Sequence, residues 1–167
     1  DESSQTLTVK ITAIPSFVTL WNGTTQVNVN DTLSVAALQG LTYKTVADAN
    51  GTGTITWTVT DNGTTNGSSD PKSVSDSLSI TVTEVNDAPT RTSAAPSAVS
   101  AAEDSANTTA ASLGLSGLTY GKGGGADESS QTLTVKITAI PSFVTLWNGT
   151  TQVNVNDTLS VAALQGL

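Results

Sequence analysis

Residues 1–41 recur without a single change as residues 127–167. The two copies are offset by 126 residues, a period far too long for one turn of a solenoid and typical of a whole domain. We therefore interpret the chain as a window on a tandem array of near-identical domains. Arrays of this kind usually have mechanical roles, in which they set spacing, reach and display.

Composition excludes several classes of function. The chain has 14 acidic and 6 basic residues and a net charge of -8, which argues against nucleic acid as a partner. No apolar run approaches about 18 residues, so no membrane insertion is expected. Cysteine and histidine are absent, so disulfides, thiol chemistry and histidine catalysis are excluded. Only oxygen ligands remain for a metal, which favours calcium, and no catalytic motif indicates an enzyme.

Alternation of apolar and polar residues predicts short, half-buried strands. The apolar positions of four such segments are Leu7, Val9 and Ile11; Val27 and Val29; Ile55, Trp57 and Val59; and Leu78, Ile80 and Val82. Turn signals such as Asn50-Gly51 and Asn66-Gly67 separate the segments. This pattern predicts an all-β fold, an antiparallel β-sandwich. A short helix or bulged turn is predicted for residues 32–40, capped by Asp31 or Thr32 and ended by Gly40.

The predicted domain boundary lies at residues 84–90, where Pro89 prevents a strand from continuing. Residues 1–87 would then be the rear part of one repeat and residues 88–167 the front part of the next. Each part would lack strands and expose sheet edges. Two interpretations stay open. Residues 42–87 of a neighbouring molecule could complete residues 88–167, head to tail, or the chain is a window on a longer array.

Acidic residues cluster in short motifs, which are Asp1-Glu2, its second copy Asp127-Glu128, Asp61-Asn62-Gly63, Glu84-Val85-Asn86-Asp87 and Glu103-Asp104. Calcium needs six to eight oxygen ligands, roughly what paired carboxylates and Asn carbonyls at strand ends can supply. The alternative is that these residues are ordinary solvated turns and caps, where Asp and Asn are common. The glycine-rich run at residues 121–125 lacks the context of a phosphate loop and is predicted to be a flexible loop tip.

Two longer motifs carry a family resemblance. Residues 58–63 (TVTDNG) followed by residues 77–89 (SLSITVTEVNDAP) resemble the end of a cadherin-like repeat, and residues 99–105 resemble the opening strand of the next. Together they resemble the tandem extender repeats of giant bacterial adhesins of the repeats-in-toxin type. The resemblance implies an Ig-like or cadherin-like sandwich, repeated about every 126 residues on the bacterial cell surface.

The resemblance also implies calcium (Ca2+) at the junctions between repeats. Glu84, Asn86 and Asp87 would share calcium with Asp127 and Glu128 of the next domain. Asp61 would serve the preceding junction together with Asp1 and Glu2. Glu103 matches a first-strand glutamate that serves a junction, and Asp104 adjoins it.

The function expected from these observations is that of a structural spacer, whose partners are neighbouring repeats of the same array. The alternative is a binding module that recognises a glycan or a protein through its tryptophans and acidic loops. The two differ in where the aromatic rings lie. Burial of Trp21 and Trp57 would favour the spacer, whereas two exposed, coplanar rings on one face would favour glycan binding.

Overall fold

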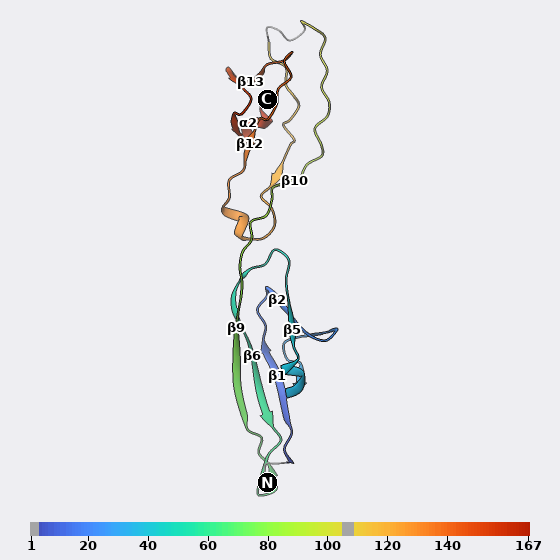
Figure 1. Ribbon diagram of the computed structural model, residues 1–167, viewed down its shortest axis with the longest axis vertical. Helices are drawn as coiled ribbons and strands as arrows, with labels where there is room; N and C mark the ends of the chain where they lie inside the picture. The colour runs from blue at the N-terminus through green and yellow to red at the C-terminus, as the bar shows by residue number, and fades with distance from the viewer. Residues whose placement is uncertain (1–3, 105–108) are drawn as a thin grey trace. The chain divides into compact units, whose positions relative to one another are not determined.

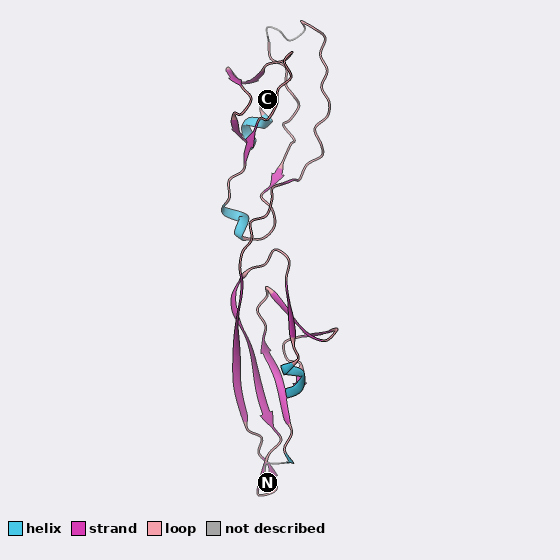
Figure 2. Cartoon of the chain, viewed as in Figure 1, coloured by secondary structure: helices cyan, strands magenta, loops and turns pink. Residues whose placement is uncertain are grey.

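The chain divides into two compact units, Asp1–Val85 and Asn86–Leu167. The computed structural model describes residues 4–104 and 109–167. The division falls within the segment 84–90 where the sequence indicates a boundary. Both units consist of antiparallel strands with little helix, as Figure 2 shows, so the fold is all-β as expected from the alternating pattern. Among the described residues, no helix is long and apolar enough to cross a membrane.

The first unit contains two sheets and a short helix. Its elements are β1 (Leu7–Ala13), β2 (Val18–Asn22), β3 (Thr25–Val27), β4 (Thr32–Ser34), α1 (Val35–Gln39), β5 (Thr42–Thr45), β6 (Gly51–Asp61), β7 (Thr64–Thr65), β8 (Ser68–Ser69) and β9 (Ser73–Val82). One sheet has the strand order β4-β1-β6-β9 and the other β3-β2-β5 (Figure 1). The strands β7 and β8 form a separate small hairpin between β6 and β9.

Side chains from both sheets meet in one core. Ile11 of β1 and Ile55 of β6 are buried with Leu20 of β2 and Val27 of β3. Trp57 and Ile80, both partly buried, pack against this cluster. The two sheets therefore share a hydrophobic interior, the arrangement of a β-sandwich.

The opposite face of the larger sheet consists mainly of threonine and serine. Hydroxyl groups of neighbouring strands form hydrogen bonds of 2.6–3.0 Å in four pairs, which are Thr12–Thr56, Thr52–Thr81, Thr58–Ser75 and Thr60–Ser73. Hydroxyl and apolar side chains lie on opposite faces because they alternate along β6 and β9, and successive side chains point to opposite faces of a sheet.

The strand predictions were wrong at three apolar positions. Leu7 lies at the end of β1, opposite Asp61, and is largely exposed. Leu78 is exposed because β9 is an edge strand with β6 as its neighbour in the sheet. Val29 lies in a turn after β3 rather than in a strand.

The short helix is confirmed as α1, but its expected caps are wrong. Ser34 is the N-cap, and its hydroxyl accepts a hydrogen bond from the N–H of Ala37 at 3.1 Å. Asp31 instead accepts a bond from the N–H of Asn28 at 2.8 Å, so it closes the preceding turn. Gly40 ends the helix as predicted.

The second unit repeats part of this structure. Its elements are β10 (Thr90–Arg91), β11 (Tyr120–Gly121), the 3₁₀ helix η2 (Asp127–Ser130), β12 (Thr134–Lys136), β13 (Leu146–Asn148), β14 (Thr151–Val153), β15 (Thr158–Ser160) and α2 (Val161–Gln165). β12 pairs with β15 in the register in which β1 pairs with β4, and β13 pairs with β14 as β2 pairs with β3. Leu118, Val153, Leu164 and Leu167 form its buried core.

The identical 41 residues are buried to different extents in the two units. Phe17 is 8% exposed, whereas its counterpart Phe143 is 86% exposed. In the first unit, β5 pairs with β2, and β6 pairs with β1. Among the described residues of the second unit, neither β12 nor β13 has such a neighbour. The difference therefore follows from what residues 42–82 supply.

Candidate metal centre in the second unit

The residues expected to bind calcium lie in several places. Asp1 and Glu2 are outside the described residues. Glu84 is exposed in the irregular segment after β9, in the first unit. Glu103 and Asp104 are exposed in a turn, where Asp104 has a φ of 65°. Four others, Asn86, Asp87, Asp127 and Glu128, belong to the second unit.

A pair of hydrogen bonds joins the start of the second unit to η2. The N–H of Asp87 donates to Oε1 of Glu128 at 2.9 Å. The side-chain amide of Gln131 donates to Oδ1 of Asn86 at 2.7 Å. Residues more than 40 positions apart are thereby brought together, Asp87 with Glu128 and Asn86 with Gln131.

Glu128 is the buried polar residue of this region, with 2% of its surface exposed. Its Oε1 is held by Asp87, but its Oε2 is buried and has no hydrogen-bond partner among the described residues. A buried carboxylate oxygen without a partner is costly, because the charge has left water and nothing compensates it. This oxygen is therefore suited to a hydrogen-bond donor or a cation.

Lys122 and Gly123, in the loop that follows β11, contact the same region. The Nζ of Lys122 donates to the backbone carbonyl of Ser129 at 2.6 Å, which fixes η2. Gly123 has a φ of 121°, and a Cβ there would lie 2.7 Å from Cβ of Asp87. The glycine-rich run is therefore not a free loop tip, since Gly121 belongs to β11 and Gly123 packs closely against Asp87.

The chemistry of these donors fits calcium in type. Asp87, Asp127 and Glu128 supply carboxylates and Asn86 an amide oxygen, and oxygen is the ligand that calcium prefers. Their positions do not form a complete calcium site, because no three acidic side chains among the described residues come together as a metal-binding group. Oδ1 of Asn86 is also engaged by Gln131. Glu128 is the residue whose environment most favours a cation.

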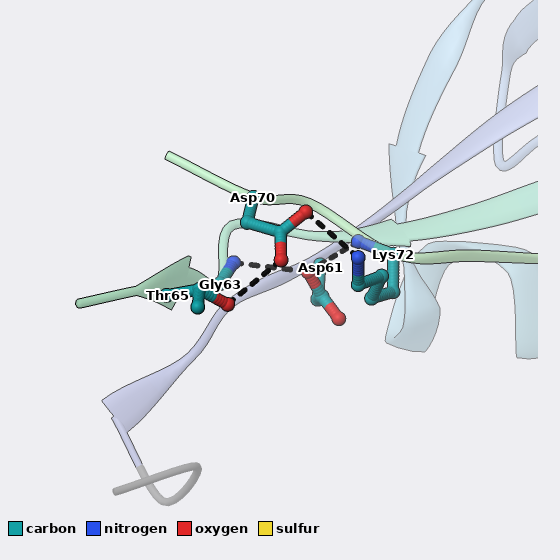
Figure 3. A network of polar contacts seen from close by, with 5 residues as sticks. All are labelled: Asp61, Gly63, Thr65, Asp70 and Lys72. Carbon is teal, nitrogen blue, oxygen red and sulfur yellow. Dashed lines mark hydrogen bonds and ion pairs between the residues drawn. The ribbon is translucent and has the colours of Figure 1, made fainter. Parts of the chain in front are cut away.

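Asp61 has a structural role in the first unit. Its Oδ1 accepts hydrogen bonds from the backbone N–H groups of Lys72, at 2.8 Å, and Gly63, at 2.9 Å (Figure 3). These two bonds hold the pKa of Asp61 below its ordinary value. The Asp61 carboxylate thus closes the connection between β6 and β9. This is the turn-forming role that the sequence offered as the alternative to calcium binding.

Asp70 completes this network and was not singled out as a site residue from the sequence. It accepts hydrogen bonds from Nζ of Lys72 and from the hydroxyl of Thr65, both at 2.7 Å (Figure 3). The bond from Lys72, followed by the bond from Thr65, lowers the pKa of Asp70. The only signal in the sequence is the dipeptide Asp70-Pro71, which predicts a turn and no more.

The tryptophans of the first unit do not form an exposed platform. Trp57 is partly buried against the core of the sandwich. Trp21 is also partly buried, and the Nζ of Lys44 lies 3.9 Å from the centroid of its ring. Trp147, the counterpart of Trp21, is more exposed. Trp21 and Trp57 are thus both partly buried, and neither is exposed as two coplanar rings for glycan binding would be.

Comparison with known proteins identifies no relative. No protein-family model matches the chain, and neither the search of curated proteins nor that of solved structures finds a match.

Proposed function

We propose that this chain is a spacer repeat of an extracellular array on a bacterial surface, stiffened by calcium where one repeat meets the next. The observation that carries the proposal is the duplication. One 41-residue sequence builds the same strand pairs and the same capped helix in two separate compact units. A module that recurs in this way is suited to extension rather than to a single specific site.

The proposal of calcium is supported by the surroundings of Glu128. Its Oε2, which has no hydrogen-bond partner among the described residues, and the neighbouring Asp87 and Asp127 place acidic groups at the start of the second unit. Extracellular modules bind calcium with dissociation constants of about 10⁻⁴ to 10⁻³ M. At about tenfold above such a constant, binding adds roughly 1.4 kcal/mol to the folded state. That amount is enough to order a boundary segment.

The binding-module alternative has less support. In the first unit Lys44 covers the ring of Trp21, and Trp57 packs on the core. These rings are therefore engaged within the unit, and no second observation favours glycan recognition.

Small-angle X-ray scattering during a calcium titration tests the proposal. We expect millimolar calcium to increase and sharpen the maximum dimension of the chain, and a chelator to reverse the change. The variant Glu128→Gln should respond much less, whereas Asp76→Asn, which alters an exposed carboxylate of β9, should respond as the unchanged chain does. If calcium changes neither the dimension nor the melting temperature of the unchanged chain, the calcium-stiffened spacer is refuted.

A further inference from the structure

Asparagine followed by glycine is the dipeptide in which an asparagine side chain reacts most readily with its own backbone. The backbone nitrogen of the glycine attacks Cγ of the asparagine and expels ammonia, and glycine has no Cβ to obstruct the approach. The pairs in this chain are Asn22-Gly23, Asn50-Gly51, Asn62-Gly63, Asn66-Gly67 and Asn148-Gly149. Because they share the same two residues, differences in their reactivity depend on the structure around them.

The turn at Asn66-Gly67 leaves both reacting groups free. The two residues connect β7 to β8, and Thr65 lies opposite Ser68 on either side of them. Their φ angles are 52° and 78°, as in the turns that favour Asn-Gly in hairpins. Both residues are exposed, and nothing lies within 4 Å of a Cβ at Gly67. In the described part of the chain, no hydrogen bond engages the Asn66 side chain or the Gly67 N–H.

The hairpin of β7 and β8 is also weakly held. Each strand has two residues, and the two strands form a sheet of their own. An isolated two-stranded hairpin is only marginally stable, and segments with few buried contacts open most easily. The hydroxyl of Thr65 donates to Asp70 at 2.7 Å, in a contact that is exposed to solvent (Figure 3). Asn66 can therefore leave its turn conformation and approach the Gly67 nitrogen while the sandwich stays folded.

The nearby pair Asn62-Gly63 is held at both of its reacting groups. The Oδ1 of Asn62 accepts a hydrogen bond from the N–H of Thr6 at 2.8 Å. The N–H of Gly63, which would supply the attacking nitrogen, donates to Oδ1 of Asp61 at 2.9 Å, and Gly63 is buried. The attack requires the glycine nitrogen to lose its proton, and the adjacent carboxylate opposes the negative charge that would form there. The structure therefore protects this pair.

The remaining pairs lie partly within strands. Asn22 belongs to β2 and lies opposite Thr25, and Asn148 belongs to β13 and lies opposite Thr151. Gly51 belongs to β6 and is paired with β9. The ladders hold one residue of each pair in register, so reaction there requires the end of a strand to open first.

We propose that Asn66 is a site of self-modification, which converts to aspartate and isoaspartate through a cyclic imide. The Gly67 nitrogen, after its proton has passed to a base in the solvent, forms a bond to Cγ of Asn66. The bond from Cγ to the side-chain amide nitrogen breaks, and that nitrogen takes up a proton and leaves as ammonia. Water then opens the imide. Cleavage of the bond to Cγ gives aspartate, whereas cleavage of the bond to the backbone carbonyl carbon gives isoaspartate.

The conversion changes the charge and the backbone of the turn. Either product adds one negative charge to a chain whose net charge is -8. Isoaspartate also lengthens the backbone by one atom, which does not fit the two-residue connection between Thr65 and Ser68. The change should stay within the hairpin, because β7 and β8 form a sheet separate from that of β6 and β9. The reaction needs only water, so the proposal does not depend on calcium or on the spacer function.

Peptide mapping of the folded chain after incubation at mildly alkaline pH tests the proposal. Incubation in heavy-oxygen water labels each new carboxylate, so that later conversion during digestion in ordinary water is not counted. Labelling at Asn66 should exceed labelling at Asn62 by about tenfold or more, because two hydrogen bonds must first break at Asn62-Gly63. Both aspartate and isoaspartate should appear at position 66, since the imide opens on either side.

Two controls separate the effect of structure from that of sequence. In denaturant, Asn62 and Asn66 should convert at similar rates, because both precede a glycine and the folded contacts are gone. The variant Asn66→Gln should remove the labelling at this position and leave that at the other pairs unchanged. Equal labelling of Asn62 and Asn66 in the folded chain would overturn the proposal. A preference for Asn66 that persists in denaturant, or the absence of isoaspartate at position 66, would overturn it as well.

Discussion

Glu128 accepts a hydrogen bond from the N–H of Asp87 through one carboxylate oxygen, while its other oxygen is buried without a partner among the described residues. Glu128 thus anchors Asp87 through Oε1, while its Oε2 is available to a ligand. Replacing the carboxylate by an amide separates the two roles, because the amide oxygen can still accept from Asp87.

We expect Glu128→Gln to abolish the calcium-dependent rise in the melting temperature of the second unit. In chelator the variant should stay close in stability to the unchanged chain, because the amide oxygen still accepts from the N–H of Asp87. Calorimetry with and without calcium measures both effects. A full calcium response in the variant would show that Glu128 is not a ligand.

Gly123 should be the least replaceable glycine of the second unit. A Cβ there would lie 2.7 Å from Asp87 Cβ, and the φ of 121° is unfavourable for any other residue. We expect Gly123→Ala to destabilise this unit by roughly 1–3 kcal/mol. Gly117→Ala is the matched control, because nothing lies within 4 Å of its Cβ position and its φ carries no such restriction. Urea unfolding compares the two, and equal stabilities would contradict the argument.

The sequence predicted the all-β class because period-2 alternation is a local signal. Ile11 and Ile55 alternate with threonines, and the structure buries both. Alternation could not predict that Leu78 is exposed, because exposure there depends on β9 being an edge strand, a property of the sheet and not of the segment.

The N-cap of α1 was also not predicted from the sequence. Asp31, Thr32 and Ser34 are all competent caps, and the extension of β4 to Ser34 decides between them.

The site was predictable only in part. The acidic motifs identified Asp87 and Glu128, which the structure brings together. The roles of Gln131, Lys122 and Gly123 depend on contacts between segments distant in sequence, so no local pattern reveals them. The pairing of Asp70 with Lys72 was likewise hidden within a turn signal.

Phe17 and Phe143 offer a comparison of one residue in two environments. They occupy the same position of an identical sequence but are 8% and 86% exposed. We expect Phe17→Ala to destabilise the first unit by about 3–5 kcal/mol, the usual cost for a buried phenylalanine. Phe143→Ala should change the stability of the second unit by less than about 0.5 kcal/mol, as for most surface substitutions.

Chemical denaturation of both variants measures the two costs. Similar costs would mean that Phe143 is covered in solution.

Acid should destabilise the first unit through Asp61 and Asp70. Hydrogen bonds hold the pKa of both carboxyl groups below the ordinary value of 3.8. A group with a depressed pKa in the folded state contributes stability that is complete above its unfolded pKa. That stability is lost as the pH falls through the folded pKa. The melting temperature of the first unit should therefore be insensitive to these groups above about pH 5 and should fall below about pH 4.

The variant Asp70→Asn separates this contribution from general acid effects. It removes the ion pair with Lys72, whose Nζ lies 2.7 Å from the carboxylate, so the decrease in melting temperature between pH 4 and pH 2 should become shallower than in the unchanged chain. Asp76→Asn changes the net charge equally and serves as the control. The effect should be small, because the ion pair is exposed to solvent and is weakened by salt. Identical acid profiles for Asp70→Asn and the unchanged chain would mean that the network does not contribute to stability.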